Sequence, residues 1–185
     1  MERIYEINMM ENKKIVWGLN ITSFILLIPF FPLFTYMADL VTENLRNSAE
    51  LGLDFLVYLL PLYILLICIH EAIHGLFFKL FCPDNPVKYG FKWKSLMAYA
   101  TSPGSLYNRQ QFMVIALAPF VLISLALTLG LALGWLSDTY YVMLAAIHAA
   151  GCVGDFYYAY LLLVKFARAD IRIEDTETGI LIYQV

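Results

Sequence analysis

Four stretches of this sequence are long, apolar and almost free of charged side chains, and this feature constrains the fold more than any other. Each stretch can supply the roughly 20 apolar residues that a helix needs to cross the hydrocarbon core of a bilayer. The chain of 185 residues is 61% hydrophobic and only 15% charged, which is far from the balance of a soluble domain. The sequence therefore predicts an all-α membrane protein with four transmembrane helices, near residues 15–37, 54–79, 111–135 and 139–165.

Two segments outside these spans have the alternation that is typical of strands. In residues 87–94, apolar side chains alternate with lysine or glycine, and residues 95–101 can return as a partner strand. A small cytoplasmic β-hairpin is therefore predicted between spans two and three. Residues 166–185 are expected to form a short soluble C-terminal tail that folds as a second hairpin. The whole chain, 1–185, is then a single membrane domain.

Lysine and arginine are distributed very unevenly around the predicted spans. Eleven of the twelve precede span one, lie between spans two and three, or follow span four, and only Arg46 lies on the other side. Because positive loops stay on the cytoplasmic side, we expect a multi-pass plasma-membrane protein with both termini in the cytoplasm. Arg109, at the start of span three, is expected to contact lipid phosphate. The sequence has no basic patch that would indicate a nucleic-acid partner. The predicted environment of the apolar spans is the lipid bilayer.

Prolines interrupt three of the four predicted spans. Pro29 and Pro32 are expected to kink or end the first helix near its outer end, and Pro61 to kink the second. Pro119 should kink the third helix, where freed backbone groups could line a cavity.

The second span contains the stretch HEAIH, which places His70, Glu71 and His74 inside an apolar helix. Residues four apart lie on one face of a helix, so the two imidazoles can reach one metal ion. Zinc suits this pair, because it binds neutral imidazole and needs a third protein ligand and an open position for catalysis. Glu71, about 100° round the helix axis, would act as a general base on a water molecule. The predicted cofactor is Zn²⁺.

Asp155, in the fourth span, is the predicted third zinc ligand. It lies 16 residues in from Thr139, while His70 lies 16 residues in from Asp54, and both spans run from outside to inside. The two positions therefore lie at matching depth. An acid within a span is costly unless it is paired or coordinated, and small residues on the Asp155 helix allow close approach. The predicted metal ligands are His70, His74 and Asp155.

His148 and Cys152 leave alternatives open on the same helix. His148, seven residues before Asp155, could pack as a hydrogen-bonded side chain, orient a ligand or bind the metal itself. Cys152, three residues before Asp155, could be a small buried thiol or point toward the metal. We favour packing for His148 and a buried thiol for Cys152. No residue is identified that would stabilise an oxyanion.

The stretch HEAIHG in a span, two further spans and the pair Gly154 and Asp155 in the last of them resemble the site-2-type intramembrane zinc metalloproteases. They resemble more closely the small four-span bacterial membrane proteins regarded as zincin peptidases. The resemblance covers roughly residues 54–165, and it implies zinc ligation by His70, His74 and Asp155 with Glu71 as the base. In site-2 proteases the distal Asp is typically followed by Gly, whereas here Phe156 follows it.

These features predict an HExxH zinc metallopeptidase that acts on a peptide or membrane-protein substrate within or next to the membrane. Two alternatives use the same polar groups: a non-catalytic zinc-binding membrane protein, and a small transporter. The predicted hairpin could receive a substrate as an added strand, or it could simply anchor the chain at the membrane interface. The identity of the substrate, any regulatory partner and the oligomeric state do not follow from the sequence.

Overall fold

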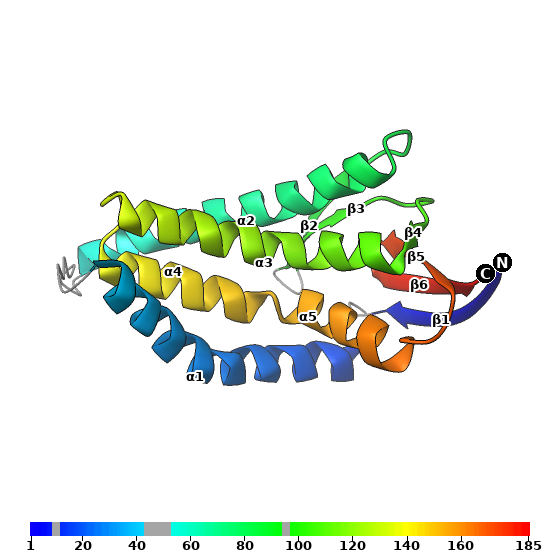
Figure 1. Ribbon diagram of the computed structural model, residues 1–185, viewed down its shortest axis with the longest axis horizontal. Coiled ribbons are helices and arrows are strands. Elements are labelled where there is room, and N and C mark those ends of the chain that lie inside the picture. The colour runs from blue at the N-terminus through cyan, green and yellow to red at the C-terminus, as the bar shows by residue number, and fades with distance from the viewer. Residues whose placement is uncertain (9–11, 43–52, 94–96) are drawn as a thin grey trace. The chain divides into compact units, whose positions relative to one another are not determined.

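The computed structural model describes residues 1–8, 12–42, 53–93 and 97–185, which are mostly helical (Figure 1). The helices are α1 (Lys13–Thr42), α2 (Leu53–Phe81), α3 (Arg109–Ala132), α4 (Asp138–Gly151), α5 (Val153–Tyr160) and the π-helical turn η1 (Leu161–Lys165). The strands are β1 (Glu2–Asn8), β2 (Lys88–Lys92), β3 (Met97–Thr101), β4 (Tyr107–Asn108), β5 (Ile171–Thr176) and β6 (Gly179–Gln184).

The chain divides into two compact units. The first, here called the sheet unit, contains Met1–Asn20, Ile69–Pro119 and Gly154–Val185. The second, the helix unit, contains Ile21–Cys68 and Phe120–Val153. All four predicted site residues lie in the sheet unit, so the geometry of the candidate site can be described within one unit.

Three helices are long and apolar enough to cross a membrane: α1, α2 from Phe55 onward, and α3. A fourth candidate consists of α4 together with residues 153–165, a pair of helices with a bend between them. Large apolar side chains on the three long helices are exposed, among them Phe24 (74%), Leu80 (65%) and Leu125 (62%). Exposed apolar surface of this extent marks a contact with lipid or another apolar partner. The helices thus indicate a membrane protein with three or four spans.

The prolines of α1 do not end it, because the helix continues through Pro29 and Pro32 to Thr42. Proline is tolerated inside membrane-spanning helices where neighbouring groups satisfy the freed backbone carbonyls. Helix α2 likewise runs through Pro61. Residues 43–52, between α1 and α2, lie outside the described part of the chain.

The fourth predicted span differs from expectation because it is not one continuous helix. Helix α4 ends at Gly151, and the Cys152 backbone N–H donates to the carbonyls of His148 and Ala149. A new helix, α5, begins at Val153 and passes into the π-helical turn η1. The break gives this part of the chain a fresh helix N-terminus inside the predicted span.

A four-stranded antiparallel sheet with the order β1, β6, β5, β4 forms the sheet unit together with the adjoining helix ends. The predicted C-terminal hairpin is confirmed as β5 and β6, whereas the pairing of β1 with β6 was not predicted. Figure 1 shows β1 (blue) beside β6 (red), with the two termini together. The core between sheet and helices includes Ile7, Phe78, Tyr107, Phe112, Ile171, Ile173, Ile180 and Ile182.

The predicted hairpin between spans two and three is confirmed as strands β2 and β3, which pair in antiparallel register. The aromatic side chains of Tyr89, Phe91 and Trp93 are exposed, with Trp93 at 81%. Tyr89 reaches back to helix α2, where its hydroxyl occupies the place that a Cβ atom on Gly75 would take, 1.8 Å from that position. Gly75, directly after His74, therefore permits the hairpin to lie close to the motif.

Candidate metal centre

Two imidazoles of helix α2 point at the same place. The Nε2 atoms of His70 and His74 lie 3.0 Å apart. This follows from the helical repeat, because side chains four residues apart project from one face. Both side chains are mostly buried, with exposed fractions of 14% and 11%. The helix therefore presents two nitrogen atoms at a spacing at which both can contact a single ion.

The ring of His74 is fixed by a second contact. Its Nδ1 lies 3.0 Å from the backbone carbonyl oxygen of Ile115 in helix α3. A carbonyl oxygen can only accept, so Nδ1 carries the hydrogen and donates it. In a neutral imidazole the lone pair then lies on Nε2, the atom that faces His70. Histidines that bind metals usually make this kind of contact through the second ring nitrogen.

Asp155 completes the group from helix α5. Its Oδ2 lies 3.5 Å from Nε2 of His70, and its Oδ1 lies 3.4 Å from Nε2 of His74. Asp155 stands in the first turn of α5, which exists because the helix restarts after Cys152. The free N–H groups of a helix N-terminus favour a carboxylate there. The structure thus brings together His70, His74 and Asp155, the three predicted metal ligands. Their role as ligands stays a prediction.

The spacing of these atoms fits zinc. Ligand atoms about 2 Å from a tetrahedral centre lie about 3.3 Å from one another. The two imidazole nitrogens lie 3.0 Å apart, and each lies 3.4 or 3.5 Å from a different oxygen of the Asp155 carboxylate, Oδ1 for His74 and Oδ2 for His70. Two imidazole nitrogens and one carboxylate also form a donor set of catalytic zinc sites, which leaves one position open.

Glu71 is held by the hairpin as well as by its own helix. The backbone N–H of Ala100 in strand β3 donates a hydrogen bond to its carboxyl group. Glu71 also interacts electrostatically with His74 and Asp155, so its carboxyl belongs to the same cluster. A carboxylate beside the ligand group is where a base acting on water is needed. The general-base role itself stays a prediction.

Asp175 in strand β5 is a further acid near the site that the sequence analysis did not identify. It receives a hydrogen bond from the Thr101 side chain, and its charge acts on both His74 and Glu71. A signal was present in the sequence, because Asp175 continues the alternation of the buried residues Ile171 and Ile173. An acid on the core face of a strand needs a partner or a function.

Asp175 is expected to make the stability of the folded protein depend on pH. Burial raises the pKa of its carboxyl from 3.8 to about 7. The hydrogen bond from Thr101 lowers the pKa, but its effect is smaller than that of burial. Between these values the unfolded chain has lost a proton that the folded chain retains, so stability falls as pH rises. Asp175→Asn removes this loss. The melting temperature of the metal-free variant minus that of wild type should therefore increase from pH 4 to pH 7 and then level off.

The exposed Asp170 provides the control for this measurement, because Asp170→Asn removes an equal charge from the same strand-bearing tail. Its melting difference from wild type should change little over the same range. A difference for Asp175→Asn that stays constant with pH would contradict the assignment of a raised pKa to Asp175.

His148 and Cys152 lie in the helix unit. Both are buried, and the Cys152 sulfur lies 3.8 Å from Nε2 of His148. This contact agrees with the packing interpretation of His148 and with a buried thiol at Cys152.

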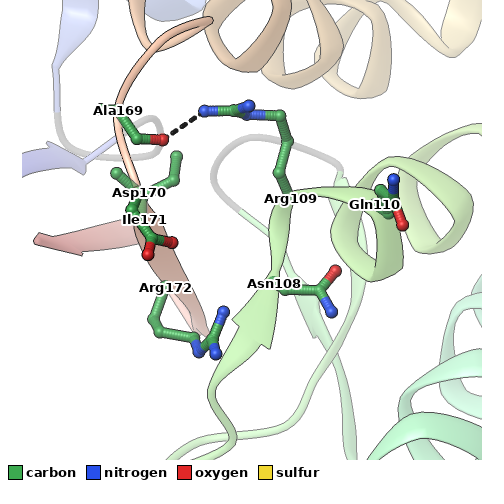
Figure 2. Close-up of a pocket in the computed structure, with 7 residues that line it drawn as sticks. All are labelled: Asn108, Arg109, Gln110, Ala169, Asp170, Ile171 and Arg172. Atoms are coloured by element: carbon green, nitrogen blue, oxygen red, sulfur yellow. Dashed lines mark hydrogen bonds between the residues drawn. The ribbon is translucent and has the colours of Figure 1, made fainter. Parts of the chain in front are cut away.

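Arg109 contacts the chain itself. Its guanidinium donates to the carbonyl oxygens of Phe166 and Ala169, which follow η1. Figure 2 shows the bond to Ala169. Arg109 thereby ties the turn that follows η1 to the start of α3. The adjoining pocket is lined by Asn108, Arg109, Gln110 and residues 169–172, and none of these is a predicted site residue.

Comparison with known proteins supports the chemistry that the site suggests. A family model described as "Putative zincin peptidase" matches residues 63–169, more than half of the chain and a region that includes His70, Glu71, His74 and Asp155. The resemblance to zincin peptidases noted in the sequence is thereby confirmed. No curated protein and no solved structure matches the chain.

Proposed function

Because the chain belongs to the family described as "Putative zincin peptidase", we propose that it is a zinc-dependent endopeptidase that hydrolyses peptide bonds within or beside a membrane. The observation that carries this proposal is the convergence of His70, His74 and Asp155, whose ligand atoms all lie within 4.8 Å of one another. Glu71 lies in the same cluster and supplies the base that hydrolysis requires.

Each side chain then has a defined part in the reaction. His70, His74 and Asp155 would hold the zinc ion, which when bound supplies Lewis-acid polarisation of the scissile carbonyl and of water. Glu71 accepts the proton of the attacking water and passes it to the nitrogen of the leaving amine. The Ala100 amide holds the Glu71 carboxylate in place during both transfers.

Strand β3 offers a place for the substrate next to Glu71. Its register with β2 pairs Ala100 with Tyr89, yet the Ala100 N–H is directed to Glu71 and therefore away from β2. Alternate residues of a strand direct their amides to the same side, so Ala98 shares this outer edge. Among the described residues, β3 has no strand partner there. We propose that an extended segment of a peptide or membrane protein pairs with this edge, since a helical substrate would hide its amides.

The sheet supports four spans with both termini on one side of a plasma membrane. Strand β1 precedes α1 and pairs with β6, the last strand of the chain, so both lie on the same side. Strand β4, between α2 and α3, joins the same sheet through β5. A sheet on one side of the membrane requires an even number of crossings in each intervening stretch, which supports counting α4, α5 and η1 together as one span. The lysine and arginine distribution supports a cytoplasmic position for this side.

Removal of zinc tests the proposal. Purified wild-type protein, produced with ample zinc, should carry about one zinc ion per chain when its metal content is measured by mass spectrometry. Treatment with phenanthroline should stop its hydrolysis of fluorescent casein in detergent micelles, and added zinc should restore it. Wild-type protein that holds no zinc under these conditions would contradict the whole scheme.

The two alternative functions predict different results in the same preparation. A non-catalytic zinc-binding protein would carry zinc but release no peptides from casein. A transporter would move zinc or protons across the bilayer of proteoliposomes, because its intramembrane polar groups would form the pathway. A zinc flux that depends on Asp155 would favour the transporter over the peptidase.

A further inference from the structure

The carbonyl group that fixes His74 has lost its usual helical partner. In an α-helix the carbonyl of one residue accepts the N–H of the residue four positions later. Four residues after Ile115 stands Pro119, which has no N–H to donate. Helix α3 nevertheless continues through Pro119, and the proline is fully buried. The Ile115 carbonyl oxygen is thus left available inside a packed region.

The His74 ring takes up this available acceptor. Its Nδ1 lies 3.0 Å from the Ile115 oxygen, and Ile115 itself is only 1% exposed. His74 is buried as well, so water has little access to either group. A buried carbonyl without a donor would cost free energy, and the imidazole N–H removes that cost.

We propose that Pro119 is a positioning residue for the metal centre. By deleting one backbone donor from α3, it reserves the Ile115 carbonyl for His74 and so keeps the Nε2 lone pair directed toward His70 and Asp155. The inference rests on the proposed zinc site, but it concerns a residue that does not touch the metal, the substrate or the reacting water.

An ordinary residue at position 119 would compete with the imidazole. Its N–H would donate to the Ile115 oxygen in regular helical geometry and draw the carbonyl toward the helix axis. His74 would then share a bifurcated acceptor or turn its ring. Because partners that orient a metal-binding histidine typically change metal affinity by about 10- to 100-fold, an effect of this size is expected at position 119.

The first test compares Pro119→Ala with a matched control, Pro61→Ala. Pro61→Ala also gives a helix back a backbone N–H, but this N–H is in α2 and cannot donate to the Ile115 carbonyl. Zinc affinity of the full chain in micelles is measured by competition with a fluorescent chelator. Pro119→Ala should bind zinc about 10- to 100-fold more weakly than wild type, and Pro61→Ala should bind like wild type. Unchanged affinity in Pro119→Ala would overturn the proposal.

A second variant separates the missing N–H from the shape of the proline ring. Lactic acid incorporated in place of Pro119 gives an ester that has neither the ring nor an N–H. It should bind zinc like wild type if the absent donor is what matters. An ester variant as weak as Pro119→Ala would show that the ring acts by packing, and would overturn the proposal.

A third test uses the wild-type protein, so its result does not depend on whether a variant folds. In the zinc-loaded protein with isotope-labelled histidine, NMR should show His74 with its hydrogen on Nδ1 and zinc on Nε2. The opposite assignment would overturn the role of Ile115 and Pro119 while leaving the zinc site intact. Wild type without zinc would instead contradict the proposed function itself, so the two failures are distinguishable.

Discussion

Replacing Glu71 with glutamine is expected to abolish peptide hydrolysis while leaving zinc bound. Glutamine matches the size of glutamate, and its amide oxygen can still accept the Ala100 N–H that holds this side chain. It cannot take a proton from water, and loss of a general base typically lowers a rate by about 10²- to 10⁴-fold. Initial rates of casein hydrolysis and zinc content, measured on one preparation, check both parts of this expectation.

The control for Glu71→Gln is Glu177→Gln, which removes an equal charge from an exposed position of the sheet unit. This variant should hydrolyse casein and bind zinc like wild type. If Glu71→Gln kept full activity, the assignment of Glu71 as the base would be wrong. A rate loss accompanied by zinc loss would place Glu71 in metal binding or in folding.

Replacing Asp155 with alanine is expected to remove zinc from the protein. Its carboxylate oxygens lie 3.5 and 3.4 Å from the Nε2 atoms of His70 and His74, so it is the only acid among the three grouped ligand atoms. Without it the two histidines supply only two donors, whereas catalytic zinc sites have three protein ligands. The loss of affinity should exceed the roughly 10- to 100-fold effect of a residue that merely orients a ligand.

Metal content and thermal stability both report this loss. Because zinc binds the folded chain, added zinc should raise the melting temperature of wild type but not that of Asp155→Ala. His74→Ala should behave in the same way, and Asp170→Ala, at an exposed position of the same unit, should respond to zinc like wild type. Stoichiometric zinc in purified Asp155→Ala would remove this carboxylate from the ligand set.

Much of the site could be predicted because its main signal is local. His70 and His74 share a helix face through a four-residue spacing that any α-helix imposes. Asp155 is distant in sequence, but counting residues from the outer end of each span places it at the same membrane depth as His70. An acid inside a membrane is costly, so a partner for Asp155 could also be expected. The strand residues near the site are not related to it by helical spacing or by membrane depth, and the alternation of β5 shows only that Asp175 faces the core. Asp175 and Ala100 reach Glu71 only through the way the tail and the hairpin fold.

The break at Cys152 and the pairing of β1 with β6 were also beyond local inference. Hydrophobic length predicts that a segment can cross a bilayer, but it does not reveal whether the helix is continuous. In the short strand Glu2–Asn8 the adjacent apolar residues Ile4 and Tyr5 interrupt the alternation that would mark it, and its partner β6 lies at the other end of the chain. Strand pairing over such a separation depends on the core that the helices and the sheet build together.

The sequence by itself determined the apolar helices, the histidine pair and the acid beside it, because hydropathy and helical periodicity are properties of contiguous residues. Only the tertiary structure decided that Asp155 begins a new helix, that Ala100 holds Glu71, and that the carbonyl freed by Pro119 meets the ring of His74. Each of these contacts joins segments that are far apart in the chain, and so depends on packing rather than on any local pattern.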